Sequence, residues 1–388
     1  MNSIYGTKDC YGCGLCAVVC SKKIIDIKLN KNGFYEPSIT DIEACTNCGI
    51  CLSVCSIKNE KLSVDNNVVV CYAAWSNDPE VRRNCSSGGV GYEIGRYLFK
   101  QGYKACAVRY NAQENRAEHY IAANDDEYAA SMGSKYIQSY TVDGFKAVNR
   151  KEKNLIIGTP CQIDSFRHYV KRFKVEDNFI FVDFFCHGVP SKHAWDKYIV
   201  EIEKNIGKAI SASWRDKTTG WQDSWAVKIK GEKGEHCKRY SEGCTFFYLF
   251  LSDCCLSKAC YDNCKYKYNH SAADIRLGDL WGKKYRNHKE GVSGVVAFTQ
   301  RGHEVLKNCN CTLIEERFDI VAEGQIKEPV KRKKLFKTIK KMLENESITI
   351  QELHKILQRE RDREKFVKRI MNPGRTIRNI IKKILRKH

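Results

Sequence analysis

Eight cysteines near the start of the chain stand at a spacing that holds iron–sulfur clusters. The segment 10–20 reads C-x2-C-x2-C-x3-C, and the same spacing recurs over residues 45–55. In this spacing the first three cysteines of each repeat bind one [4Fe–4S] cluster and the fourth binds the other. We therefore predict two clusters, one held by Cys10, Cys13, Cys16 and Cys55 and the other by Cys45, Cys48, Cys51 and Cys20.

Two further observations bear on this prediction. A zinc site is the alternative, but zinc is four-coordinate in structural sites and rarely uses eight cysteines at this spacing. The proline that commonly follows the fourth cysteine is replaced here by Ser21 and Ser56. This replacement removes no ligand, so the prediction of two clusters stands.

The elements that must position these cysteines form a small ferredoxin-like domain, expected over residues 1–60. Apolar stretches at 24–29 and 34–37 flank the pair Asn32-Gly33, which predicts a β-hairpin. Such a domain has too few apolar side chains to build a core of its own. We therefore expect its folding to be coupled to cluster binding.

A larger domain, expected over residues 70–330, alternates apolar runs with helical stretches. The runs at 68–74, 105–109, 154–158 and 179–185 are typical of strands, and residues 89–101 and 161–173 are typical of helices. This alternation predicts a mixed α/β (α+β) fold in which a mixed sheet is combined with helices.

Six short motifs in this larger region occur in an order that points to a known family. They read CSSGG at 85–89, GSKYIQS at 133–139, GTPCQ at 158–162, DFFCHGVPS at 183–191, WRDKTTGW at 214–221 and DIRLGDLWG at 274–282. Taken in order, they resemble the coenzyme F-420 hydrogenase/dehydrogenase beta-subunit family. The resemblance covers roughly residues 1–330, including the ferredoxin-like start.

The resemblance implies a flavoprotein, normally one that binds FAD, although nothing in the residues distinguishes FAD from FMN. Ser86, Ser87, Gly88 and Gly89 open a predicted helix, and hydroxyls and backbone N–H groups at a helix start suit a phosphate group. Lys135 and Thr159 are expected to add a cation and a further donor to the flavin pyrophosphate. A plain serine cap of the helix is the alternative.

The resemblance also implies a third [4Fe–4S] cluster, with Cys161, Cys186, Cys260 and Cys264 as its ligands. Cys161 and Cys186 each follow a predicted strand, and strand ends converge near the ligand crevice of an α/β sheet. The last pair is spaced C-x3-C where the family has C-x2-C, so Cys255 is an alternative to Cys264. Separate buried thiols remain the alternative to a cluster.

Positive charge is concentrated in a helical tail, expected over residues 331–388. This tail holds 20 Lys and Arg against 6 Asp and Glu, whereas the preceding 330 residues hold 46 against 40. A basic amphipathic stripe built on Ile377, Ile380, Ile381 and Ile384 suggests an anionic membrane surface or a partner. The alternative is a helix packed on its own domain. We expect no nucleic-acid partner, because the tail lacks interleaved aromatic residues.

The chain lacks a run of 18 apolar residues and lacks a basic start followed by an apolar stretch. We therefore expect a cytoplasmic protein, either free or peripheral to the inner face of the membrane. Cysteines grouped at ligand spacing fit such a reducing compartment.

The predicted function is oxidoreduction, in which electrons pass between a one-electron carrier, the clusters and a flavin, with hydride exchange to a deazaflavin-like or other substrate. The alternative is a non-catalytic electron-transfer subunit of a larger complex, with a link to bacterial polysaccharide synthesis in some relatives. The expected partners are a ferredoxin-like carrier or a redox subunit, and a homo-oligomer is compatible with the sequence.

Overall fold

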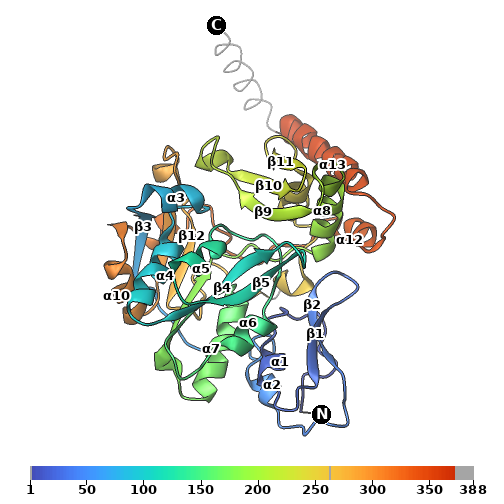
Figure 1. Cartoon of the computed structure of the whole chain (residues 1–388). Helices are drawn as coiled ribbons and strands as arrows, with labels where there is room; N and C mark the ends of the chain where they lie inside the picture. The colour runs from blue at the N-terminus through green and yellow to red at the C-terminus, as the bar shows by residue number, and fades with distance from the viewer. Residues whose placement is uncertain (1, 262–263, 372–388) are drawn as a thin grey trace.

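One nine-stranded sheet organises the part of the chain described by the computed structural model, residues 2–261 and 264–371 (Figure 1). Its strand order is β14-β3-β13-β12-β8-β7-β4-β5-β6, and β4, β7, β8 and β12 run parallel to one another. The prediction of a mixed α/β fold is confirmed. The strands are β3 (Val70–Ser76), β4 (Lys104–Asn111), β5 (Arg116–Ala122), β6 (Ser139–Tyr140), β7 (Asn154–Ile157), β8 (Phe179–Phe184), β12 (Ile275–Asp279), β13 (Ser293–Ala297) and β14 (Cys311–Glu315).

Helices cover both faces of this sheet because its central strands bury both sets of alternating side chains. In β8, Ile180 and Val182 pack with α4 and α10, whereas Phe179 and Phe181 pack with α6 and α7 on the opposite face. The helices that follow or precede these strands are α3 (Pro79–Asn84), α4 (Val90–Lys100), α5 (Asp125–Tyr128), α6 (Val142–Ala147), α7 (Pro160–Arg172), α10 (Gln300–Asn308) and α11 (Phe318–Val321).

The N-terminal segment forms a small unit against α6 and α7 (Figure 1). It contains α1 (Leu15–Val19), the antiparallel hairpin of β1 (Ile25–Leu29) and β2 (Tyr35–Ile39), and α2 (Ile50–Ser53). Leu15 and Val54 are fully buried in the same core cluster as Phe166 of α7. The unit therefore shares its core with the larger region, which compensates for its few apolar side chains.

A second, three-stranded sheet with its own helices follows β8 in the sequence. The sheet has the order β11-β10-β9, from β9 (Ala209–Arg215), β10 (Trp225–Gly231) and β11 (Gly234–Arg239). It packs with α8 (Lys192–Ile206), α9 (Thr245–Leu251), α12 (Phe336–Glu344) and α13 (Ile350–Met371). No helix in the described ranges is both long enough and apolar enough to cross a bilayer.

The first part of the basic tail packs on the protein itself. Helices α12 and α13 bury Ile339, Leu343, Ile350, Leu353 and Leu357 against α8 and α9. These residues form an apolar stripe at helical spacing that covers an existing core. The predicted break at Pro373-Gly374 and the isoleucine stripe after it lie outside the described residues.

Candidate functional site

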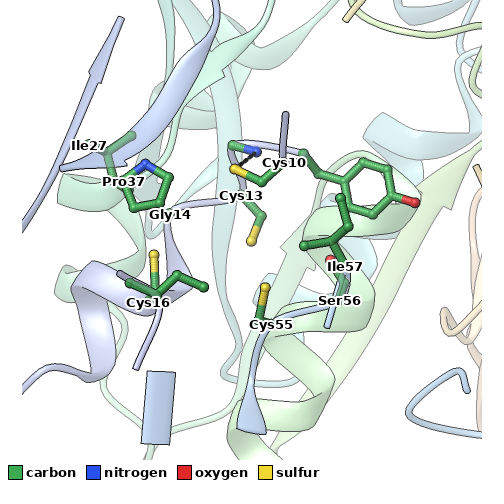
Figure 2. Close-up of a pocket in the computed structure, with 12 residues that line it drawn as sticks. Cys10, Cys13, Gly14, Cys16, Ile27, Pro37, Cys55, Ser56 and Ile57 are labelled. Atoms are coloured by element: carbon green, nitrogen blue, oxygen red, sulfur yellow. Dashed lines mark hydrogen bonds between the residues drawn. The ribbon is translucent and has the colours of Figure 1, made fainter. Parts of the chain in front are cut away.

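The first group of predicted ligands surrounds a pocket in the N-terminal unit. Cys10 and Cys13 lie on the loop before α1, Cys16 is on α1, and Cys55 follows α2. Figure 2 shows the four sulfur atoms facing a common space beside Ile27 and Pro37. Gly14 caps α1 with φ 76°, a left-handed conformation that glycine adopts without strain. We refer to these four cysteines as the inner group.

The chemistry of the inner group fits a bound iron–sulfur cluster. Burial raises the pKa of the Cys10 thiol to about 12, and negative charge at Cys13 and Cys55 adds to the shift. Burial likewise raises the pKa of Cys13 to about 11. Metal coordination deprotonates a thiol outright, so a cluster would stabilise buried thiolates that are otherwise unfavourable here.

The second predicted group, Cys20, Cys45, Cys48 and Cys51, lies closer to solvent, and we call it the outer group. Cys48 is exposed, Cys20 and Cys45 are half-buried, and Cys51 packs in the same core cluster as Cys16. The backbone N–H of Ile50 lowers the pKa of Cys48, and the positive charge of Arg172 acts in the same direction. The outer group therefore presents an accessible edge of the N-terminal unit.

Four cysteines from distant segments form a third group next to the main sheet. Cys161 is in the first turn of α7 after β7, and Cys186 follows β8, the neighbouring parallel strand. Burial raises the pKa of Cys260 to about 12, with negative charge at Cys186 and Cys264 contributing. Burial also raises the pKa of Cys161 well above its usual value, again with Cys186 and Cys260 contributing.

Cys255, the alternative ligand, has different neighbours. Its pKa is raised by burial and by Cys254, and its carbonyl accepts a hydrogen bond from Ser191 N–H at 2.7 Å. It packs in the core cluster of the second sheet, whereas Cys264 packs with Tyr11 and Cys161. The structure thus brings Cys264, and not Cys255, to the third group.

The ligands of a single metal ion must lie closer together than the cysteines that bind an iron–sulfur cluster. Within the ranges that the structure describes, no three His, Cys, Asp or Glu side chains are close enough to hold a single metal ion. A [4Fe–4S] cluster has four thiolate ligands, one on each iron, so its cysteines surround a larger core.

Two residues that the sequence analysis did not single out connect the inner and third groups. Tyr11 lines the inner pocket, and its pKa is raised by burial and by charge at Cys264, Cys161 and Cys260. Ser165 on α7 lies 3.2 Å, Oγ to Sγ, from Cys13. In the sequence, Tyr11 could have been noticed because it lies inside the first cysteine repeat. Ser165 could have been noticed because it follows Cys161 by one helical turn.

The loop 86–89 makes most of its polar contacts within the protein. The Ser87 hydroxyl donates to Val292 O at 2.8 Å, and Gly88 N–H donates to Ser293 Oγ at 3.0 Å. A Cβ on Gly88 would meet Ala74 O at 2.4 Å, so this glycine allows close packing against β3. Gly89 caps α4 with φ 87°. Ser86 Oγ accepts from Ser134 N–H at 2.8 Å and retains its own hydrogen as a donor.

The other two predicted flavin contacts lie in different places. Lys135 is adjacent to Ser134 and donates to three carbonyls, those of Ala130, Ser131 and Met132, and burial lowers its pKa to about 7. Thr159 lies instead beside the third group, with its Oγ1 3.2 Å from Cys161 Sγ. The structure therefore places Lys135 beside the 86–89 loop through Ser134, and Thr159 beside Cys161.

Residues of three sequence motifs meet near the carboxyl end of β12. Arg215 pairs with Asp279 at 2.8 Å and donates a further hydrogen bond to the Tyr136 hydroxyl at 3.3 Å. Trp221 donates to Asp279 at 2.8 Å and stacks on Trp281 with ring centroids 5.0 Å apart. Segments far apart in the sequence thus build one polar and aromatic wall at this edge of the sheet.

Comparisons with known proteins match three successive parts of the chain. A model of the 4Fe-4S dicluster domain matches residues 9–59. Models of the N-terminal and C-terminal parts of the coenzyme F420 hydrogenase/dehydrogenase beta subunit match residues 71–145 and 151–320. Comparison with curated proteins gave no match. Among solved structures, a chain of the F420-reducing [NiFe] hydrogenase complex from Methanosarcina barkeri is 17% identical, with 78% of this chain and 94% of that chain covered and a TM-score of 0.44.

Proposed function

Because the chain belongs to the coenzyme F420 hydrogenase/dehydrogenase beta-subunit family and carries a 4Fe-4S dicluster domain, we propose that it is an iron–sulfur flavoprotein oxidoreductase. Electrons pass between a one-electron carrier at the N-terminal unit and a flavin beside the main sheet. A deazaflavin-like compound or another hydride acceptor exchanges hydride with that flavin.

The observation that carries this proposal is the succession of three cysteine groups. The outer group is exposed at Cys48, and it joins the inner group through the shared packing of Cys51 and Cys16. Negative charge at Cys13 of the inner group contributes to the raised pKa of Cys161 in the third group. One-electron transfer needs closely spaced centres, and three neighbouring sets of four cysteines supply sites for them.

A flavin accepts two electrons as a hydride and releases them one at a time, which clusters require. We propose FAD, held by the 86–89 loop and the Gly133–Lys135 segment. Ser86 offers its hydroxyl hydrogen there, and the first amides of the eleven-residue helix α4 favour a negative group. In this proposal Thr159 contributes to the third cluster rather than to the flavin phosphates.

The experiment is anaerobic purification of the full chain, followed by counts of iron, sulfide and released flavin. About twelve irons and one FAD per chain would support three clusters and a flavoenzyme. About eight irons without flavin would contradict the flavoenzyme and favour a non-catalytic electron-transfer subunit of a larger complex. A preparation with bound FMN would overturn the choice of FAD alone.

We also propose that the end of α13 and the residues after it bind an anionic membrane surface. Phe366, Ile370 and Met371 are 63%, 61% and 73% exposed, and basic residues lie close by in the sequence. An exposed apolar stripe with Lys and Arg beside it suits the interface of an anionic bilayer. The full chain should pellet with anionic vesicles but not with neutral ones. Equal pelleting of a form lacking residues 373–388 would contradict a role for those residues and leave the binding to the end of α13.

A further inference from the structure

A buried serine on α7 contacts the inner group at one of its sulfur atoms. Ser165 is fully buried, and its Oγ lies 3.2 Å from Cys13 Sγ. The same Oγ accepts a hydrogen bond from the backbone N–H of Ser56 at 3.2 Å. Ser56 directly follows Cys55, another ligand of the inner group. One hydroxyl therefore meets two segments of the N-terminal unit at the inner pocket.

The direction of the contact with Cys13 changes when the sulfur becomes a ligand. A serine hydroxyl has one hydrogen to donate and two lone pairs to accept with. Ser56 N–H occupies one lone pair, so the hydroxyl hydrogen remains available. A free Cys13 thiol can donate to Ser165, but a thiolate bound to iron has no hydrogen and can only accept. In the cluster-bound protein, Ser165 is therefore the only possible donor in its contact with Cys13 Sγ.

The role of Ser56 in this contact depends on its backbone and not on its side chain. Its hydroxyl is buried without a hydrogen-bond partner among the described residues, whereas its N–H is the donor to Ser165. The commoner residue at this position of the repeat is proline, which has no N–H. The departure from the usual repeat at Ser56 thus supplies the hydrogen bond that orients Ser165.

We propose that Ser165 is a positioning residue that raises the reduction potential of the inner cluster, and that Ser56 N–H holds it in place. The proposal rests on the proposed function, because it requires a cluster at the inner group. A hydrogen bond donated to a ligand sulfur stabilises the more negative, reduced state of the cluster. This change in potential acts at the inner cluster. In the proposed electron path, the inner cluster lies between the outer group and the third group, which has its ligand Cys161 on α7.

Helix α7 connects this effect to the next centre. It carries Cys161 in its first turn and Ser165 one turn later, and its buried face packs against Leu15 and Val54 of the N-terminal unit. The same rigid element therefore holds a ligand of the third group and the hydrogen-bond donor to the inner group. Because Cys161 and Ser165 are one helical turn apart on α7, the position of the helix determines the positions of both side chains.

The test is a redox titration of the full-length protein, purified without oxygen and followed by electron paramagnetic resonance. Ser165→Ala and Ser56→Pro should each make the midpoint potential of one N-terminal cluster more negative. The expected change is about tenfold in the equilibrium constant for reduction, equivalent to about 59 mV for one electron. The other N-terminal cluster should keep its potential.

Three matched variants separate the hydrogen bond from general disturbance. Ser56→Ala keeps the N–H and should leave the potential unchanged. Ser21→Pro introduces proline at the equivalent place in the first repeat and should leave the inner potential unchanged. Ser165→Thr keeps a hydroxyl and should retain most of the wild-type potential.

Several outcomes would overturn the proposal. An unchanged potential in Ser165→Ala with full iron content would do so, as would equal shifts in Ser56→Ala and Ser56→Pro. Loss of the inner cluster in Ser165→Ala but not in Ser165→Thr would assign the hydroxyl to assembly instead of to potential. Absence of iron–sulfur signals from the wild-type protein would refute the proposed function itself, which is a different result.

Discussion

At the scale of single residues, the surroundings of a sulfur atom decide its chemistry. Cys264 shares its environment with Tyr11 and Cys161, both of which border predicted cluster sites. Cys255 is fully surrounded by the core of the second sheet, next to Cys254. A buried thiol without other ligands nearby behaves as a small apolar side chain.

This contrast predicts different effects of two cysteine substitutions. Cys264→Ala should lower the iron content from about twelve to about eight per chain, because a cluster ligand is lost. Cys255→Ala should leave the iron content unchanged and serves as the matched control. Iron and sulfide analysis of both variants checks the prediction, and loss of iron from Cys255→Ala alone would contradict it.

A buried ion pair joins two central strands of the main sheet, β8 and β12. Arg276 on β12 and Asp183 on β8 are 2.7 Å apart, and both side chains are 0% exposed. Asp183→Asn leaves the arginine charge buried without its counter-ion, which should destabilise the protein by about 3–5 kcal/mol. Chemical denaturation measures this loss.

The control for this prediction is an ion pair at the surface. Asp319 pairs with Arg317, and these side chains are 54% and 82% exposed. Asp319→Asn should change stability by no more than about 0.5 kcal/mol. Equal losses in the two variants would mean that burial of the Asp183 pair is unimportant.

At the scale of elements, the loops that carry the cysteines depend on close backbone contacts. Gly12 has φ 65°, and a Cβ there would lie 2.4 Å from Tyr35 O on β2 and 2.4 Å from Gln138 Nε2. Gly6 has a similar φ of 71°, but a Cβ there would meet nothing within 4 Å. Both glycines therefore have a left-handed φ, but only Gly12 lacks space for a Cβ.

Alanine substitutions at these glycines separate backbone strain from steric conflict. Gly6→Ala should cost about 1–2 kcal/mol from the left-handed conformation alone. Gly12→Ala should in addition displace the Cys10–Cys13 loop from β2 and prevent assembly of the inner cluster. Iron content and visible absorbance report on assembly, and normal iron content in Gly12→Ala would contradict the prediction.

At the scale of the whole molecule, the basic tail has a packed part followed by exposed apolar residues. Helices α12 and α13 contribute Ile339, Leu343, Ile350, Leu353 and Leu357 to the core of the second sheet. The exposed residues Phe366 and Met371 come after this packed part. The first part of the tail therefore belongs to the core of the second sheet, and the end of α13 is exposed to solvent.

Two truncations test this division. A chain ending at Met371 should keep the thermal stability of the full chain, because no described core residue is removed. A chain ending at residue 330 should lose solubility or stability, since it exposes the apolar surface of α8 and α9. Thermal unfolding and sedimentation measure both effects, and a stable, soluble chain of 330 residues would contradict the prediction.

The N-terminal dicluster domain and the main strands were predictable because their signals are local. Cluster ligands in one repeat lie within a short loop, and the predicted strands and helices match β3, β4, β7, β8, α4 and α7 to within about two residues. Periodicity of apolar residues over such segments reflects the face that each one buries. The family could likewise be recognised from the order of short motifs along the chain.

Only the tertiary structure decided which distant residues share a site. The third group combines Cys161, Cys186, Cys260 and Cys264 from three segments. The pairing of β7 with β8 brings the first two together, and the 260–264 segment lies close to them. The same packing brought Ser165 to Cys13 and buried the apolar faces of α12 and α13. Local spacing defines a ligand repeat, but long-range contacts depend on how strands pair and helices pack, which no single segment encodes.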